Sequence, residues 1–253
     1  SLGIEYLSAA LKQAGHETAL ALDPGLFGVN DNVFYVPRLE RFLAQRERLL
    51  AFARSGRPDV VAFSAYTNSF QWCLEMAREV RRFSRARIVL GGPHVTLAPD
   101  VAARRPEVDF ALVGECEEAF VELVDALEKG RPTHAIANVW TRRDGDVRGN
   151  PVRPPIQDLD ALPLPDKALF EADVNFEDDY LVLASRGCIF NCNYCCESFI
   201  NDLYQRRFYR RRSVDNVIHE LRVMRERYHY REVMFNDAVL CVDKTWLRDP
   251  MAR

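Results

Sequence analysis

Four of the seven cysteines of the chain lie in one short stretch. Cys188, Cys192, Cys195 and Cys196 fall within nine residues, and the first three have the spacing C-x3-C-x2-C. Thiolates are soft ligands that select zinc or iron–sulfur clusters. Three thiolates on one loop can bind three irons of a [4Fe–4S] cube and leave the fourth iron without a protein ligand. The spacing therefore predicts a metal centre with one open coordination position.

Two other metal centres would each need a fourth protein ligand. A structural zinc site closes its tetrahedron with a fourth cysteine or histidine. The nearest candidates are Cys196, which is strained by its adjacency to Cys195, and the distant His219. A fully ligated ferredoxin cluster uses four cysteines at other spacings. The three-ligand cluster fits the spacing best.

Strand and helix patterns alternate on both sides of the cysteine cluster. Strands are expected at residues 18–22, 59–64, 87–90, 108–113, 181–184 and 232–235. Helices are expected at residues 4–14, 39–52, 68–83, 119–130 and 214–228. This alternation predicts an α/β fold in which helices cover both faces of a parallel sheet.

A proline-rich stretch divides this series of elements. Residues 151–166 hold five prolines, which fix φ and remove backbone donors, so an extended connector is expected. We expect one domain over residues 1–149, a connector over 150–178 and a second domain over 179–253. Both ends of the chain fall in helical patterns, which suggests a fragment without its first strand and its C-terminal region.

Small and polar residues follow three strands of the first domain. Parallel α/β sheets bind ligands at the edge formed by the carboxyl ends of their strands. The candidates are Ser64, Tyr66 and Thr67 after one strand, Gly91, Gly92 and His94 after the next, and Gly114 and Glu115 after the third. A glycine at a strand end also fits a plain turn, so both interpretations stay open.

Composition excludes several other classes of protein. The 253 residues carry 34 Lys and Arg against 37 Asp and Glu, a net charge of −3, which argues against a nucleic-acid partner. The five arginines of residues 206–212 fit a solvated loop better than an RNA contact. The apolar runs fall short of the about 18 residues of a transmembrane helix, and a secretory leader is not visible. We expect a cytoplasmic protein in which Cys73, Cys116 and Cys241 are small core residues.

Around the cysteine cluster the chain resembles the radical S-adenosylmethionine (SAM) superfamily. The motif C-x3-C-x-aromatic-C of that superfamily is matched by Cys188, Cys192, Tyr194 and Cys195. The resemblance implies a partial TIM-like barrel and a cluster whose open iron chelates SAM. It implies reductive cleavage of SAM to a 5′-deoxyadenosyl radical, with an electron from a reductant such as flavodoxin or ferredoxin. It also places Tyr194 near the adenine, although a packing aromatic is the alternative.

A second segment resembles the cobalamin-linked branch of the same superfamily. Residues 233–237 are similar to its pattern F-x-D-D-x-F, with Asn236 in place of the first acid. The resemblance implies SAM contacts from Asn236 and Asp237. A strand-end turn closed by a side-chain cap is the alternative.

The first domain resembles the cobalamin-binding domain that precedes many radical SAM domains. Residues 2–17, 91–94, 113–117 and 159–166 carry this likeness. It implies a flavodoxin-like sheet that binds cobalamin through the eight strand-end residues named above. The motif D-x-H-x2-G, which supplies an axial histidine to cobalt, is not found in the sequence, so His16 is expected to be structural.

Together the resemblances imply a cobalamin-dependent radical SAM enzyme that uses a [4Fe–4S] cluster, SAM and cobalamin. Methylation of an unactivated carbon of a small molecule is the leading expectation. The first alternative is a radical cyclase or oxygenase of the anaerobic magnesium-protoporphyrin ester cyclase type. The second is a non-catalytic corrinoid or iron–sulfur binding module.

Overall fold

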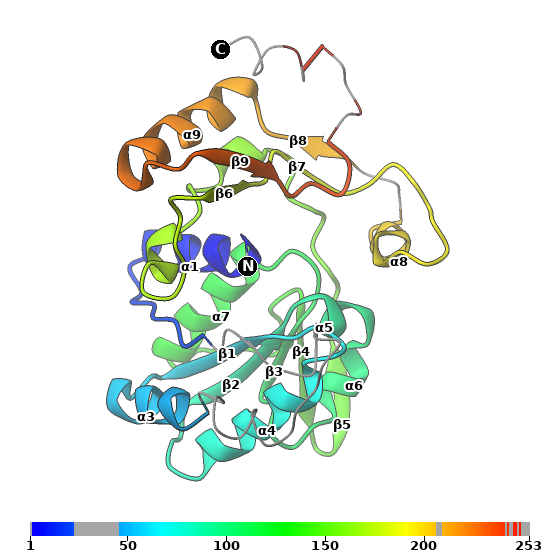
Figure 1. Ribbon diagram of the computed structural model, residues 1–253. Coiled ribbons are helices and arrows are strands. Elements are labelled where there is room, and N and C mark those ends of the chain that lie inside the picture. The colour runs from blue at the N-terminus through cyan, green and yellow to red at the C-terminus, as the bar shows by residue number, and fades with distance from the viewer. Residues whose placement is uncertain are drawn as a thin grey trace. The chain divides into compact units, whose positions relative to one another are not determined.

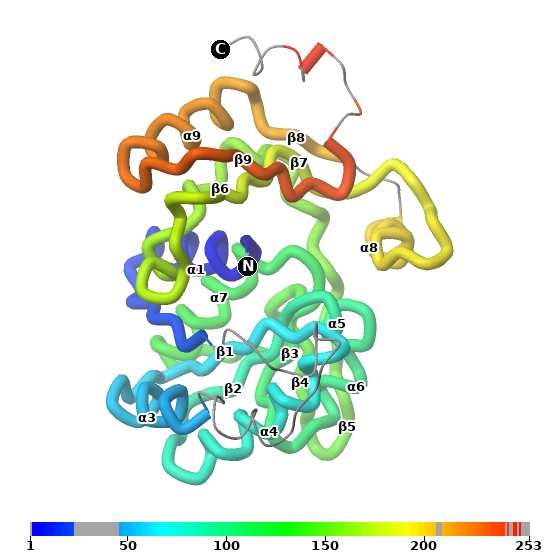
Figure 2. Tube along the Cα trace, in the orientation of Figure 1, coloured from blue at the N-terminus to red at the C-terminus, as the bar shows by residue number. Residues whose placement is uncertain are grey.

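The computed structural model describes residues 2–22, 46–205, 209–240, 242, 245–246 and 248. The chain divides into two compact units, one of residues 19–153 and the other of residues 1–18 with 154–253. Figure 2 traces the path of the chain by residue number. Within the described ranges, every helix falls short of the length and apolar character that a membrane span requires.

The unit of residues 19–153 is built on a five-stranded sheet of order β1-β2-β3-β4-β5. Its strands are β1 Val60–Ser64, β2 Arg87–Gly91, β3 Phe110–Leu112, β4 Val139–Arg143 and β5 Asp146–Gly149. The first three strands are parallel, with Ala62 opposite Val89 and Val89 opposite Phe110. The last two strands are antiparallel. The predicted α/β class with a flavodoxin-like sheet is confirmed, although only β1, β2 and β3 are parallel and β4 and β5 form an antiparallel edge.

Helices cover both faces of this sheet, with α7 on the face opposite to α3 and α4 (Figure 1). The helices are α3 Arg46–Gly56, α4 Phe70–Arg81, α5 Pro93–Leu97, α6 Pro99–Ala103 and α7 Glu117–Glu128. Buried residues of α4 recur at helical spacing and face the sheet. They join Ile88 and Leu90, alternate residues of β2, in one apolar core. This core fixes the strands whose carboxyl ends carry the predicted ligand site.

The antiparallel hairpin β4–β5 was not predicted. Asp144 and Gly145 connect its strands, and both have positive φ, 53° and 87°. A two-residue Asp-Gly turn of this kind matches the twist of a hairpin. This dipeptide is the sequence signal that identifies the hairpin.

The second unit contains two short pairs of strands. They are β6 Asp179–Val182 with β9 Glu232–Phe235, which are parallel, and β7 Ser185–Arg186 with β8 Arg210–Arg211, which are antiparallel. Its helices are α1 Leu2–Gln13, α8 Cys196–Leu203 and α9 Val214–Tyr228, with 3-10 turns η1 Leu159–Ala161 and η2 Lys167–Phe170. Tyr180, Val182 and Val217 are fully buried in the core between β6 and α9. The predicted elements at 214–228 and 232–235 are confirmed.

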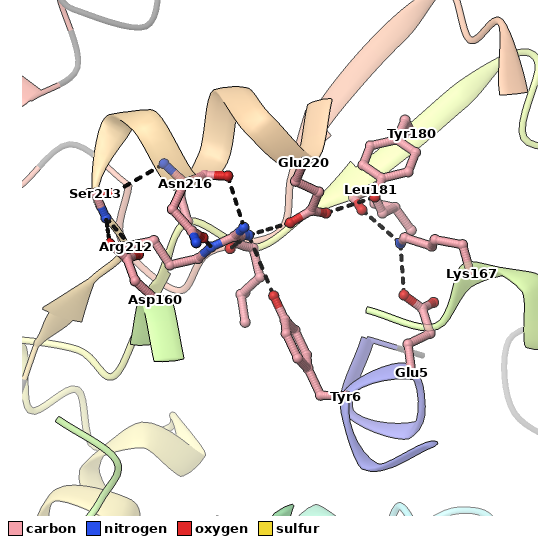
Figure 3. Close-up of polar contacts among 12 residues, drawn as sticks. Glu5, Tyr6, Asp160, Lys167, Tyr180, Leu181, Arg212, Ser213, Asn216 and Glu220 are labelled. Atoms are coloured by element: carbon pink, nitrogen blue, oxygen red, sulfur yellow. Dashed lines mark hydrogen bonds and ion pairs between the residues drawn. The ribbon is translucent and has the colours of Figure 1, made fainter. Parts of the chain in front are cut away.

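A buried polar network holds α1 in this second unit (Figure 3). Lys167 is 1% exposed, and its ammonium lies 2.8 Å from the Glu5 carboxylate of α1 and donates to the Leu181 carbonyl of β6 at 2.8 Å. On α9, Glu220 accepts from the Tyr180 hydroxyl at 2.7 Å and pairs with Arg212. Buried charges need such partners. Helix α1 is therefore tied to residues more than 150 positions later in the chain.

One predicted strand is wrong, and several predictions lie outside the described residues. Residues 18–22 alternate between half-buried and exposed, as a strand would, but they form no ladder within the described ranges. The helix predicted from 39 is described only from Arg46, where α3 begins. Cys241 and residues 206–208 of the arginine-rich run are outside the described residues. Cys73 and Cys116 are buried, as expected for core residues.

Candidate functional site

The predicted metal ligands lie on the loop between β7 and α8. The chain leaves β7 at Arg186, passes through this loop and enters α8 at Cys196 (Figure 2). The Cys188 side chain is 7% exposed, while those of Cys192 and Cys195 are half-buried. Cys196, outside the motif, is exposed. The loop thus displays three thiols with graded access to solvent.

Local hydrogen bonds shape this loop. The Cys195 amide donates to the Cys192 carbonyl at 3.0 Å, which forms a turn between two predicted ligands. The Ser198 hydroxyl donates to the Cys195 carbonyl at 2.7 Å. The Asn201 amide of α8 donates to the Cys188 carbonyl at 3.2 Å and to the Phe190 carbonyl at 3.1 Å. Asn201 and Ser198 were not predicted, because nothing in their types or spacing marks them.

The thiols do not form a closed mononuclear metal site. In a tetrahedral zinc site with Zn–S near 2.3 Å, two sulfurs are about 3.8 Å apart. Among the described residues, these cysteines are not gathered in any group of three ligand atoms within 4.8 Å of one another. A cube bonds each thiolate to a different iron and holds the thiolates further apart. An all-thiol donor set of this kind on one loop fits an iron–sulfur cluster.

Tyr194 projects from the loop beside one predicted ligand. Its side chain is 93% exposed. The electrostatic interaction with the neighbouring Cys192, together with a hydrogen bond to it, raises the pKa of the Tyr194 phenol. Burial and the nearby Cys195 likewise raise the pKa of the Cys196 thiol. Tyr194 is thus an uncovered aromatic ring next to the cysteines, and its contact with SAM stays a prediction.

Asp237 connects the end of β9 to the strand that leads into the cysteine loop. Its carboxylate accepts from the Ala184 amide at 3.2 Å and from the Ser185 hydroxyl. Burial raises the pKa of this carboxyl, and the hydrogen bonds from Ser185 and Ala184 oppose the effect. Asn236 is exposed, and its backbone amide donates to the Val182 carbonyl. This geometry fits the strand-end cap weighed above, and SAM contacts from both residues stay predictions.

At the carboxyl edge of the large sheet, Gly92 permits a close approach of backbone. Its φ is +96°, and a Cβ there would lie 2.8 Å from the Ala65 nitrogen and 3.0 Å from the Ser64 hydroxyl oxygen. The Ala65 amide also donates to the Gly91 carbonyl at 2.8 Å. Only a residue without Cβ fits this position. The ends of β1 and β2 therefore form one tight backbone cradle.

His94 lies beside this cradle, half-buried at the start of α5. Its Nδ1 is 3.1 Å from the Thr67 hydroxyl, and its ring contacts Phe70 with the centroids 4.2 Å apart. Its Nε2 is buried and has no hydrogen-bond partner among the described residues. Burial lowers the pKa of His94, which favours the neutral form of the ring. The structure thus brings Ser64, Thr67, Gly92 and His94 together at this edge, and their contact with cobalamin stays a prediction.

The turn of Gly114 and Glu115 is held by an asparagine that was not predicted. Asn138 is fully buried, and its amide donates to the Val113 carbonyl at 2.7 Å and the Glu115 carbonyl at 3.3 Å. It has a positive φ of 68°. The Gly114 amide donates to the Thr96 hydroxyl. Tyr66, which follows Ala65 in the chain, is exposed.

Known proteins resemble the chain over both units. The B12 binding domain family model matches residues 1–124. An uncharacterized methyltransferase, PH0819, of Pyrococcus horikoshii is 35% identical over 74% of this chain and 41% of its own length. Anaerobic magnesium-protoporphyrin IX monomethyl ester cyclase of Rubrivivax gelatinosus is 26% identical over 87% of this chain and 38% of its own length.

One solved structure shares the fold of nearly the whole chain. It is the radical S-adenosylmethionine methyltransferase TsrM from Kitasatospora setae, with tryptophan substrate and a SAM analogue bound. Its TM-score is 0.72 at 16% identity, over 99% of this chain and 47% of that protein. TsrM has also been solved with cobalamin and a [4Fe–4S] cluster bound. The chain spans less than half the length of each of these three proteins.

Proposed function

Because the chain belongs to the family of radical SAM proteins that carry a B12-binding domain, we propose that it acts in cobalamin-dependent radical SAM methylation. The substrate is a small molecule with an unactivated carbon. The observation that carries the proposal is the loop of Cys188, Cys192 and Cys195, which offers three thiols directly after β7. A reductant such as flavodoxin or ferredoxin completes the system.

The cysteine loop would hold a [4Fe–4S] cluster and SAM. Cys188, Cys192 and Cys195 would bind three irons, and the fourth iron would take SAM. When bound, the cluster supplies the electron that cleaves SAM and cobalamin supplies the methyl group. Tyr194 would cover the adenine with its exposed ring. Asp237 accepts a hydrogen bond from the Ser185 hydroxyl and so holds β7, the strand that leads to Cys188.

The carboxyl edge of the large sheet would hold cobalamin. Gly92 lets the ends of β1 and β2 approach closely, which sets the shape of this edge, and the His94 ring has a nitrogen without a partner among the described residues. Ser64 and Thr67 offer hydroxyl groups to polar groups of the corrinoid. Asn138 holds the Gly114–Glu115 turn through its hydrogen bonds to the Val113 and Glu115 carbonyls. The buried unpartnered nitrogen and the glycine cradle are the structural features that fit such a ligand.

A first experiment tests the cluster and the cleavage of SAM. The chain is reconstituted anaerobically, iron and sulfide are counted, and 5′-deoxyadenosine is measured after reduction with SAM present. We expect about four irons per chain, as in a [4Fe–4S] cluster, and loss of cleavage in Cys192→Ala. Cys196→Ala, in the same loop but outside the motif, is the control that keeps both. A preparation that binds only zinc contradicts the proposal.

A second experiment tests the corrinoid and the transfer. We expect a corrinoid to bind with a change in its visible spectrum, and a labelled methyl group to pass from SAM to the corrinoid. Binding of both cofactors without SAM cleavage would identify a binding module instead of an enzyme.

Radical cyclisation is the second candidate, because two relatives are named as anaerobic magnesium-protoporphyrin IX monomethyl ester cyclases. The two functions differ in the product. Methylation adds the labelled methyl carbon to the substrate, whereas cyclisation forms a ring without it. Mass spectrometry of the product with labelled SAM decides between them.

A further inference from the structure

Helix α8 begins directly after the last predicted ligand and directs one polar side chain inward. Asn201 is 3% exposed, although asparagine is usually found at the surface. It lies thirteen residues after Cys188. A buried amide needs hydrogen-bond partners, so its contacts show what it does.

Within the described residues, the Asn201 amide nitrogen makes two hydrogen bonds, and both go to the cysteine loop. Nδ2 donates to the carbonyl of Cys188 at 3.2 Å and to the carbonyl of Phe190 at 3.1 Å. Since both partners are acceptors, the nitrogen must face the loop, and this sets the orientation of the amide. Oδ1 is buried without a hydrogen-bond partner among the described residues. The side chain is thus used as a two-proton donor to one short segment.

That segment has little apolar packing of its own. Ile189 is 37% exposed and Phe190 is 54% exposed, so neither side chain anchors residues 188–190 in a core. Cys188 nevertheless is only 7% exposed. At the other end of the loop, the Cys195 backbone is held by Cys192 and Ser198. At the Cys188 end, the Phe190 amide donates to the Cys188 sulfur at 3.4 Å, and Asn201 supplies two hydrogen bonds from outside the segment.

We infer that Asn201 is a positioning residue that holds the Cys188 end of the loop in its ligand-binding shape before any metal arrives. The role for which it positions Cys188, cluster binding, rests on the proposed function. The positioning itself is a property of the metal-free chain. Groups that orient metal ligands in this way commonly change metal affinity about 10- to 100-fold when they are lost.

The inference is tested first without metal. Asn201→Asp keeps the size of the side chain, removes both donors and sets a carboxylate against two carbonyl oxygens. Asn191→Asp makes the same chemical change at an exposed position of the same loop and is the matched control. Each metal-free chain is alkylated with iodoacetamide, and the rate at each cysteine is followed by mass spectrometry. Asn201→Leu, of similar size, repeats the test without an added charge.

We expect Asn201→Asp and Asn201→Leu to raise the alkylation rate of Cys188 about tenfold and the control to leave it unchanged. Protection of Cys73, buried in the other unit, together with an unchanged far-ultraviolet circular dichroism spectrum, shows that the chain is still folded. Equal protection of Cys188 in the wild type and both Asn201 variants overturns the inference. If Asn201→Asp unfolds globally, the alkylation rates of Asn201→Leu and of Asn201→Ser, a smaller polar replacement, decide the test.

A second measurement separates this inference from the proposed function. After anaerobic reconstitution, Asn201→Asp is expected to lose iron to a chelator about tenfold faster than the wild type, with an altered electron paramagnetic resonance spectrum. One outcome is that the wild type binds no cluster while Asn201→Asp still raises the alkylation rate of Cys188. In that case the proposed function fails and the positioning role stands. If the wild type binds a cluster and the variant matches it in iron loss and spectrum, the positioning role fails.

Discussion

The two candidate sites of this chain are held in different ways. At the carboxyl edge of the large sheet, backbone contacts and the glycine at position 92 define the shape, and an apolar core lies beneath the strands. In the other unit, side chains hold the loop of the cysteines and a network of buried charges holds α1. The first site depends on backbone shape, and the second depends on a few polar partners. Substitutions should therefore act differently in the two units.

Breaking the buried network should have the largest effect. Lys167→Met leaves the Glu5 carboxylate buried without its ammonium partner, which typically costs about 3–5 kcal/mol. The double variant with Glu5→Met replaces both charges and should recover most of this stability. Urea unfolding of the three chains gives the comparison. Equal stability of the wild type and Lys167→Met would show that the pair contributes nothing.

Gly92→Ala should be the most damaging change at the sheet edge. The new Cβ would lie 2.8 Å from the Ala65 nitrogen at a φ of +96°. We expect a loss of about 1–3 kcal/mol from backbone strain, with further loss from the clash, and no corrinoid binding. Gly130→Ala, at φ +61° with nothing within 4 Å, shows the strain alone. Thermal unfolding measures the loss of stability, and corrinoid absorbance measures the loss of binding. Equal effects of the two variants would exclude the clash.

Asn138→Ala should loosen the Gly114–Glu115 turn by a smaller amount. It removes donors to two carbonyls, and unsatisfied buried groups cost about 1–3 kcal/mol. Because Asn138 has a positive φ of 68°, alanine also adds strain. Asn138→Gly removes the same donors without that strain, so the difference between the variants isolates it. Hydrogen exchange of the Gly114 amide reports the turn, and unchanged exchange in both variants would contradict the role of Asn138.

His94 should give the smallest effect, visible as a dependence on pH. Burial lowers its pKa below the ordinary 6.5, so the unfolded chain takes up a proton first as the pH falls. The stability contributed by neutral His94 is complete above about pH 6.5 and is lost as the pH falls through the lowered pKa of the folded state. His94→Asn should flatten this part of the profile of urea midpoints against pH. An identical profile in the variant would rule out His94 as its source.

Local patterns predicted most of the regular elements, whereas tertiary partners escaped prediction. Helix α9 and strand β9 follow from apolar periodicity, and the motif of Cys188, Cys192 and Cys195 is visible as spacing. The hairpin β4–β5 was missed although Asp144 and Gly145 mark its turn. Residues 18–22 show the reverse error, because an alternating pattern forms a strand only where a partner strand exists.

The supporting residues of both sites could not be predicted from the sequence alone. Asn138 and Asn201 are isolated asparagines, and asparagine is common in any turn or on any helix surface. Their roles follow from hydrogen bonds to carbonyls that lie far away in the sequence. The partners of α1 were equally hidden. The helical pattern of α1 is visible in the sequence, but the role of Glu5 follows only from its ion pair with Lys167.

Because α1 is bound to residues much later in the chain, its contacts can form only after those residues have been synthesised. Helix α1 is synthesised before residues 19–153, whereas its partners Lys167 and Arg212 are synthesised only after them. The five described strands of the large sheet all lie within residues 19–153, so this sheet can form before α1 makes its contacts. A substitution in α1 that removes Glu5 would thus destabilise the unit that residues 154–253 complete, and would leave the sheet of residues 19–153 intact.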